Sequence, residues 1–164
     1  MTKPAIRQVE AHDLARCFEI ESSAYAGDEA ASKDKIRQRI ASYPEGFIVI
    51  ELEEEVIGFI NCGACHKVEL SDEAFKELVG HDPEGKHIVI MSVAVHPDYQ
   101  KQGYASEVMS YFIEHMRAME KVAIHLICQT ELIKFYQRFG FQYDKASDSA
   151  HGGLSWHEMS LVLL

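Results

Sequence analysis

Apolar residues recur along the chain with two periods, about every second residue and about every third or fourth, which predict strands and helices respectively. Residues 6 to 9 are typical of a short strand. The stretch AHDLARCFEIESSAY predicts a helix behind an N-cap at Asp13, with helical spacing relating Leu14, Cys17, Phe18, Glu21 and Tyr25. A second helix is predicted from an N-cap at Ser32, and Pro44 ends it because proline lacks a backbone donor.

The middle of the chain is rich in β-branched residues. FIVIEL, the acidic turn EEE and VIGFINCGA predict a β-hairpin. Ser71 is a candidate cap for a short helix that ends at Gly80. IVIMSVAV, residues 88 to 95, is almost wholly apolar, which predicts a central strand covered on both faces.

The last third alternates between the two periods. A long helix is predicted from Gly103, with Val108, Phe112, His115 and Met119 on one face. VAIHLI predicts a strand, ELIKFYQRF a helix closed by Gly140, and FQYD and LSWHEMSLVLL two more strands. We therefore expect an α/β (mixed α+β) fold, with one domain over residues 1–164. Its central, twisted, mixed sheet has about six to seven strands flanked by helices.

Charge excludes some partners. Sixteen Lys and Arg against 26 Asp and Glu give a formal net charge of −10, which repels phosphate backbones and anionic membranes, so we expect neither nucleic acid nor membrane as a partner. The N-terminus lacks the apolar segment of a signal peptide, and no apolar run reaches the roughly 18 residues that span a bilayer. We expect a cytoplasmic protein whose four cysteines are reduced thiols.

A polar stretch, HPDYQKQGYASEV, interrupts the apolar pattern directly after the predicted central strand. A strand that leads into a helix through a glycine-containing turn leaves backbone N–H groups unpaired at the positive end of the helix dipole. Such a turn can bind phosphate oxygens. Small residues at Gly103 and Ala105 allow a ligand to approach the backbone, and Ser106 offers a hydroxyl donor. The alternative is a plain connection between a strand and a helix.

A second segment, FYQRFGF, ends the next predicted helix at a glycine and places Tyr136 after the neighbouring strand. In this order, the two segments resemble the GCN5-related N-acetyltransferase (GNAT) superfamily and, within it, the arylalkylamine N-acetyltransferases. The likeness covers nearly the whole chain: FEIESSAY, YPEGFIV, SVAVHPDYQKQGYAS, LICQTELIKFYQRFGF and LSWHEM. FYQRFGF is the most specific of these matches.

The resemblance implies a single GNAT-like domain that uses acetyl-CoA as its cosubstrate. It implies that the pantetheine arm pairs with the backbone of Val93, Ala94 and Val95, and that the pyrophosphate lies on the N–H groups of the following turn. The residues of that turn are Gln100, Lys101, Gln102, Gly103, Tyr104, Ala105 and Ser106. Gln100 stands where the family often has arginine, so one charge is missing. Tyr136 is implied to lie near the CoA sulfur and to act as the general acid for the departing thiolate.

The chain departs from the arylalkylamine enzymes at two positions. In those enzymes a pair of histidines on the central strand feeds a proton path, and the resemblance matches them to Val89 and Met91 here. Neither of these side chains can carry a proton. The candidates for a base are then Glu21, His66 and His87, in falling order of preference. Glu21 is also a candidate for holding a cationic amine, and the alternative for it is a solvated helix residue.

The motif CGACH, residues 62 to 66, has the spacing of a c-type haem attachment site. Residues three apart in a strand point to opposite faces, and no signal peptide is present, so small core residues are the better interpretation. The nine histidines show no zinc-type spacing, and we expect no metal.

The first hypothesis is an acetyl-CoA-dependent acyltransferase that acetylates a primary amine of a small molecule, arylalkylamine-like or polyamine-like, by direct attack on the thioester. A second is an enzyme that acetylates protein N-termini or lysines. A third is a non-catalytic module that binds CoA. The sequence leaves open whether the chain forms a homodimer.

Overall fold

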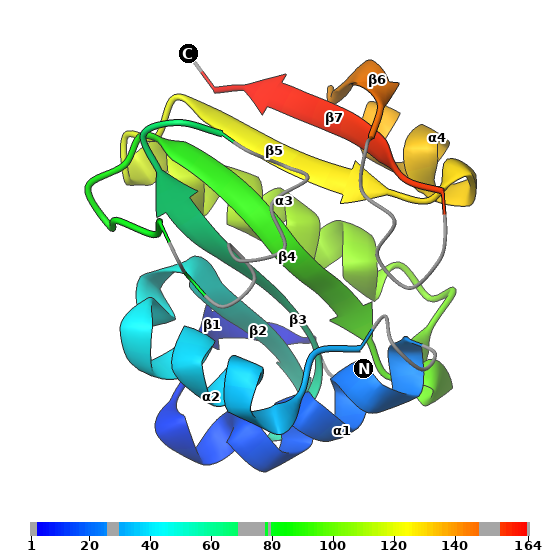
Figure 1. Cartoon of the computed structure of the whole chain (residues 1–164). Helices are drawn as coiled ribbons and strands as arrows, with labels where there is room; N and C mark the ends of the chain where they lie inside the picture. The colour runs from blue at the N-terminus through cyan, green and yellow to red at the C-terminus, as the bar shows by residue number, and fades with distance from the viewer. Residues whose placement is uncertain (1–2, 26–29, 69–77, 79, 148–154, 164) are drawn as a thin grey trace. The chain divides into compact units, whose positions relative to one another are not determined.

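The structure, a computed structural model, describes residues 3–25, 30–68, 78, 80–147 and 155–163. Helices and strands are interspersed along these residues (Figure 1). The helices are α1 (Leu14–Ala24), α2 (Lys33–Ser42), α3 (Tyr104–Ala118) and α4 (Ile133–Gln137). The strands are β1 (Ala5–Gln8), β2 (Phe47–Leu52), β3 (Glu55–Cys65), β4 (His87–Val95), β5 (Ala123–Cys128), β6 (Gln142–Ala146) and β7 (His157–Val162).

The strands have the hydrogen-bonded order β1-β2-β3-β4-β5-β7-β6, with β4 in the middle. β4 and β5 are parallel, whereas β1 with β2, β2 with β3, β5 with β7 and β6 with β7 are antiparallel. The predicted fold class, a mixed sheet of six to seven strands flanked by helices and centred on the apolar strand, is confirmed. The chain divides into two compact units, and the prediction of one domain over residues 1–164 stays a prediction.

The first unit comprises residues 1–62 and 92–114. β2 and β3 form the predicted hairpin, whose turn places Glu53 and Glu54 at φ values of 52° and 68°. Helices α1 and α2 lie side by side (Figure 1). Their apolar faces contribute Ile20 and Ile36, both fully buried, to a core that also holds the tilted rings of Phe47 and Phe59, 5.3 Å apart.

The second unit comprises residues 63–91 and 115–164. Here the first residues of β4 pair with β5, in a register that sets His87 opposite Ala123. The ammonium group of Lys121 is buried and donates hydrogen bonds of 2.7 Å to the carbonyl oxygens of Pro83 and Gly85. A charged side chain is stable in such a position because both bonds replace its hydration.

Two predicted caps differ in outcome. The Ser32 hydroxyl accepts a hydrogen bond of 3.2 Å from the N–H of Lys35, which confirms that it caps α2. Asp13 makes no side-chain cap for α1. That prediction was wrong because the Asp13 carboxylate instead accepts hydrogen bonds from Arg7 and from the N–H of Glu10, at 2.8 Å each. The predicted helix from Ser71 to Gly80 lies mostly outside the described residues.

Helix α3 follows the predicted apolar period with a shifted stripe. Val108, Met109, Phe112 and Met116 are fully buried, while His115 is half-buried and Met119 lies beyond the helix end.

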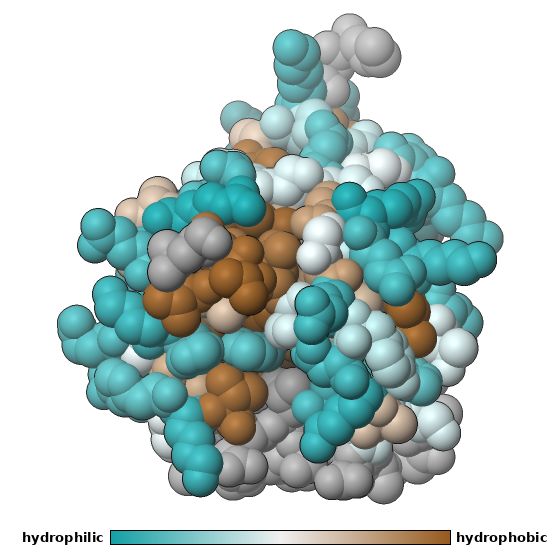
Figure 2. All heavy atoms as spheres, turned by 90° about the horizontal axis from the view of Figure 1, so that it is seen from above, coloured by the Kyte–Doolittle hydropathy of each residue, from teal (hydrophilic) through white to brown (hydrophobic). Residues whose placement is uncertain are grey.

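Hydrophilic residues form most of the face in Figure 2, around apolar residues gathered near its middle.

Candidate functional site

The C-terminal part of β4 offers a strand edge that β3 does not occupy. The N–H of His96 donates to the carbonyl of Ile57 in β3 at 2.8 Å. Because successive residues of a strand direct their backbone groups to opposite sides, Val93 and Val95 direct theirs away from β3. The register of β4 with β5 covers only the three residues from His87 to Val89. Within the part of the chain that the structure describes, the register of β4 with β5 therefore does not extend to the backbone groups of Val93 and Val95.

Two side chains of the first unit lie on this edge. The Tyr25 hydroxyl donates to the carbonyl oxygen of Val93 at 2.6 Å and accepts from its N–H at 3.2 Å. The side-chain amide of Gln100 donates to the carbonyl oxygen of Val95 at 2.9 Å. Sequence reasoning placed Tyr25 on a helix face and missed this contact, because its partner is 68 residues away.

The turn between β4 and α3 has the geometry of an anion cradle. Lys101 and Gly103 have φ values of 64° and 90°, so the backbone reverses in the left-handed region just before the helix. A Cβ built on Gly103 would meet no atom within 4 Å, which means that the backbone here is open to a ligand. The N–H of Glu107 donates to the Gly103 carbonyl at 3.1 Å, which marks the first turn of α3, and the N–H groups at the start of an α-helix have no partner within that helix. The residues present fit a phosphate group at the start of a 15-residue helix.

A buried polar cluster lies beside the edge in the first unit. Glu21 and Arg39 are 1% and 2% exposed. Glu21 accepts a hydrogen bond of 2.8 Å from the N–H of Ala31, and Arg39 donates to Asn61 and Ser92 at 3.3 Å. Burial lowers the pKa of Arg39, and the negative charge of Glu21 opposes that shift. Glu21 is therefore not the solvated helix residue that was its alternative interpretation, whereas its roles as base or amine holder stay predictions.

Tyr136 lies in α4 of the second unit and is 5% exposed. Its ring meets those of Phe135 and Phe141 edge to face, with centroids 5.1 and 5.6 Å apart. The backbone carbonyl of Tyr136 accepts hydrogen bonds from Phe139 and Phe141, which ties the helix end to the following strand. The side chain is thus fixed in orientation by aromatic packing.

The other candidate bases lie in the second unit. His66 is exposed and contacts the Asp82 carboxylate at 2.9 Å. His87 shares a hydrogen bond of 2.9 Å with His125, which the sequence analysis did not single out. Burial lowers the pKa of His125, the charge of His87 lowers it further, and Asp144 raises it. A pair of histidines is therefore present in this chain, on β4 and β5, although Val89 is buried and Met91 only partly exposed at the expected positions.

The cysteines and possible metal ligands fall outside the cradle. Cys62 and Cys65 of CGACH are free and buried, and the Cys62 thiol donates to the carbonyl of Gly46. One cluster within the described part of the chain, Glu10, His12 and Asp13, has ligand atoms within 4.8 Å of one another. Asp13 already binds Arg7 through both carboxylate oxygens, so the cluster is an ion-pair network.

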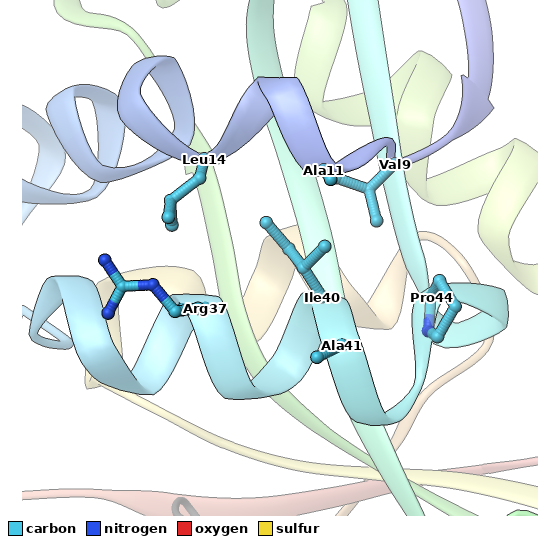
Figure 3. A pocket seen from close by; sticks show the side chains of 7 residues that line it. All are labelled: Val9, Ala11, Leu14, Arg37, Ile40, Ala41 and Pro44. Carbon is cyan, nitrogen blue, oxygen red and sulfur yellow. The ribbon is translucent and has the colours of Figure 1, made fainter.

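Two pockets of the first unit share no residue with the cradle. One, of about 250 Å³, opens where the start of α1 faces α2 (Figure 3). Its lining residues are Val9, Ala11, Leu14, Arg37, Ile40, Ala41 and Pro44. The other, of about 530 Å³, is lined by the ion-pair network of Arg7 and Asp13. Neither is lined by Tyr136 or by the candidate bases Glu21, His66 and His87.

The β4 edge and the turn before α3 lie where the sequence resemblance implies that an acyltransferase binds CoA. The model of the acetyltransferase (GNAT) family matches residues 12–141, and the chain belongs to this family. It is an acyltransferase of the GNAT type.

Named relatives agree with this class. The chain is similar to serotonin N-acetyltransferase of Mesocricetus auratus, with 28% identity over 155 residues that cover 92% of this chain and 73% of that protein. Its fold is similar to the loading GNATL domain of CurA from Lyngbya majuscula, with a TM-score of 0.86, 15% identity and 98% of each chain covered. It is also similar to yncA of Salmonella typhimurium, solved with its cofactor acetyl-CoA, with a TM-score of 0.72, 21% identity and coverage of 99% and 95%.

None of the helices in the described ranges combines the length and the apolar character that a bilayer crossing requires.

Proposed function

We propose that this chain transfers the acetyl group of acetyl-CoA to a primary amine of a small molecule, arylalkylamine-like or polyamine-like. The observation that carries the proposal is the β4 edge and the left-handed turn at Lys101 and Gly103, joined within one unit. The similarity to serotonin N-acetyltransferase supports the amine acceptor.

The first unit supplies the groups that bind the donor. The N–H groups of residues 101 to 106 would hold the pyrophosphate at the start of α3, where the helix dipole favours negative charge. Gln100 adds no charge at this site, so the binding relies more on the backbone donors and the dipole than it would with arginine at this position. The backbone of residues 93 to 95 would pair with the pantetheine arm, as the family resemblance implies.

Acetyl-CoA supplies an activated acetyl group as a thioester. The amine nitrogen forms a bond to the carbonyl carbon, the bond from carbon to sulfur breaks, and the nitrogen loses one proton. An N–H of the β4 edge would polarise the carbonyl oxygen. From the family resemblance we assign Tyr136 as the general acid, whose hydroxyl donates a proton to the departing sulfur. No covalent acetyl-enzyme forms.

The acceptor amine must lose its proton before it attacks, since a free alkylamine has a pKa of roughly 10. Val89 and Met91 cannot take that proton. Glu21, His66 and His87 are the candidate bases, in that order. The net charge of −10 favours cationic acceptors, polyamines and aromatic amines alike.

An amine panel tests the proposal directly. The protein is incubated with acetyl-CoA and phenethylamine, tryptamine, spermidine, an aminoglycoside or a peptide with a free N-terminus, and the released CoA thiol is measured. Thiol release with one or more small amines is the expected result. Release with the peptide alone would make the chain a protein acetyltransferase, and CoA binding without release from any amine would make it a non-catalytic module.

The Tyr136→Phe variant tests the acid. Without its hydroxyl, the thiolate leaves unprotonated, and we expect kcat to fall on the order of 100-fold with the best amine of the panel. Tyr143→Phe is the matched control, because it removes a half-exposed hydroxyl of the same unit that binds only His157 among the described contacts. An unchanged kcat for Tyr136→Phe across the pH range would remove Tyr136 from the mechanism.

A further inference from the structure

The Tyr25 hydroxyl satisfies both backbone groups of one residue. It donates to the Val93 carbonyl at 2.6 Å and accepts from the Val93 N–H at 3.2 Å. A hydroxyl can do both at once because it has one donor and two acceptor lone pairs. An amide also has one donor and one acceptor. Tyr25 therefore gives Val93 the same pair of bonds that an amide of an extended ligand would give.

Gln100 bonds one of the two backbone groups of Val95, two residues further along the strand. Its side-chain amide donates to the Val95 carbonyl at 2.9 Å. Val93 and Val95 direct their backbone groups to the same side of β4, because alternate residues of a strand share a side. Side chains from the end of α1 and from the turn after β4 thus occupy the edge on which, under the proposed function, the pantetheine arm pairs.

Tyr25 is held in place from its own helix. It is the C-cap residue of α1, and its N–H donates to the Glu21 carbonyl at 3.1 Å. The ring is half-buried and packs against the core of the first unit, and its hydroxyl bonds both backbone groups of Val93. Rotation of the side chain away from Val93 would leave the hydrogen bond between the Tyr25 N–H and α1 in place.

We propose that Tyr25, together with Gln100, competes with the pantetheine arm of the acyl donor for the edge of β4, so that donor binding exchanges side-chain hydrogen bonds for ligand hydrogen bonds. This inference rests on the proposed function. The exchange keeps the number of bonds to Val93 nearly constant, and the edge therefore adds little net affinity. The affinity for CoA then comes mainly from the turn at the start of α3, and Tyr25 sets how much of it the pantetheine arm contributes.

The experiment compares two ligands on three proteins by calorimetry. CoA carries the pantetheine arm, and the adenosine bisphosphate fragment of CoA lacks it. In Tyr25→Phe the competing hydroxyl is absent, so we expect CoA to bind roughly threefold to tenfold more tightly, the value of about one net hydrogen bond. The affinity for the fragment should not change. Tyr111→Phe, which alters an exposed tyrosine of α3, should leave both affinities at the wild-type values.

Each outcome has one meaning. Tighter binding of CoA alone supports the exchange, and unchanged or weaker CoA binding in Tyr25→Phe overturns it while the proposed function stands. No CoA binding to the wild-type protein removes the proposed function itself. A second measurement covers a variant that fails to fold: 3-fluorotyrosine at position 25 should change its fluorine shift with CoA and not with the fragment. The absence of a change with CoA would overturn the exchange.

Discussion

Glu21 and Arg39 form the most buried pair of opposite charges in the described part of the first unit. Both are almost fully removed from water, at 1% and 2% exposure. A buried charge is stable only when a partner and hydrogen bonds replace its hydration, which Ala31, Asn61 and Ser92 supply here. Through these bonds Arg39 connects α2 to β3 and β4, and Glu21 connects α1 to the residue just before the cap of α2.

The Glu21→Gln variant separates a structural role from a catalytic one. It keeps an oxygen for the Ala31 N–H but leaves Arg39 without the opposing charge, so we expect the free energy of unfolding to fall by about 3 kcal/mol. Urea titration measures it. Glu19→Gln is the control on the same helix, since Glu19 is exposed and pairs only with Arg16 among the described ion pairs, and it should change stability by less than about 1 kcal/mol. If Glu21→Gln kept its stability but lost kcat, Glu21 would be the base.

Individual residues also show where sequence reasoning ends. It assigned Glu21 and Tyr25 to one helix face, because periodicity reveals which positions of a helix point inward. It did not predict that the Tyr25 hydroxyl reaches Val93, or that His87 meets His125, because no local pattern encodes a partner that only the tertiary fold brings near. Asp13 was mistaken for a cap because the competing donor, Arg7, belongs to a different element.

At the scale of elements, two glycines mark the points where the backbone reverses next to a helix. Gly103 precedes α3 with φ of 90°, and Gly140 follows α4 with φ of 97°. Residues other than glycine rarely adopt such φ values, because their Cβ would come too close to the backbone oxygen. The surroundings differ: a Cβ at Gly103 would meet no atom within 4 Å, whereas one at Gly140 would meet Leu161 at an ordinary 3.4 Å.

Alanine at each glycine tests the cradle. Gly103→Ala and Gly140→Ala should both lower the free energy of unfolding by about 1 to 2 kcal/mol, because each forces a Cβ into the left-handed region. Only Gly103→Ala should also weaken acetyl-CoA binding, since its new methyl group lies beside the N–H groups of the turn. Thermal unfolding and calorimetry report the two effects. Equal affinity for acetyl-CoA in the two variants would place the pyrophosphate elsewhere.

Elements were easier to predict than sites. The strands and helices followed from hydrophobic period and from residues such as Ser32, Pro44 and Gly140, whose effects on the backbone are local. The extent of the buried stripe on α3 was less predictable, because Met109 and Met116 are buried by contacts that depend on packing. The turn at Gly103 was predicted from local sequence, because a glycine between an apolar strand and a helix is a local signal for a turn.

For the whole molecule, the His87 and His125 pair links stability to pH. Burial and the charge of His87 hold the pKa of His125 below its ordinary value of 6.5, although Asp144 opposes them. In the pH range between the folded pKa and 6.5 the unfolded chain binds a proton that the folded chain does not. The stability that His125 contributes is therefore complete above pH 6.5 and is lost as the pH falls toward its folded pKa.

Urea midpoints between about pH 8 and about pH 5 measure this dependence. We expect the urea concentration at the midpoint to decrease for the wild-type protein as the pH is lowered below about 6.5. The decrease should be smaller for His125→Asn. His12→Gln is the comparison variant, because the His12 side chain is 72% exposed and lies in a different group of charges, with Glu10 and Asp13. If His125→Asn showed the same dependence on pH as the wild-type protein, other groups would cause the loss of stability at acid pH.

The four cysteines are buried, with exposures of 0%, 2%, 4% and 2% along the chain. Burial raises the pKa of Cys17 to about 12 and that of Cys128 to about 11. The thiolate is the form of cysteine that attacks a disulfide reagent, so such a reagent labels the cysteines of the folded chain very slowly. When such a reagent is used to measure turnover, its signal then comes from the thiol of released CoA alone. Without substrate, the same reagent measures local unfolding, because the rate at which it labels each cysteine depends on how often that part of the core opens to solvent.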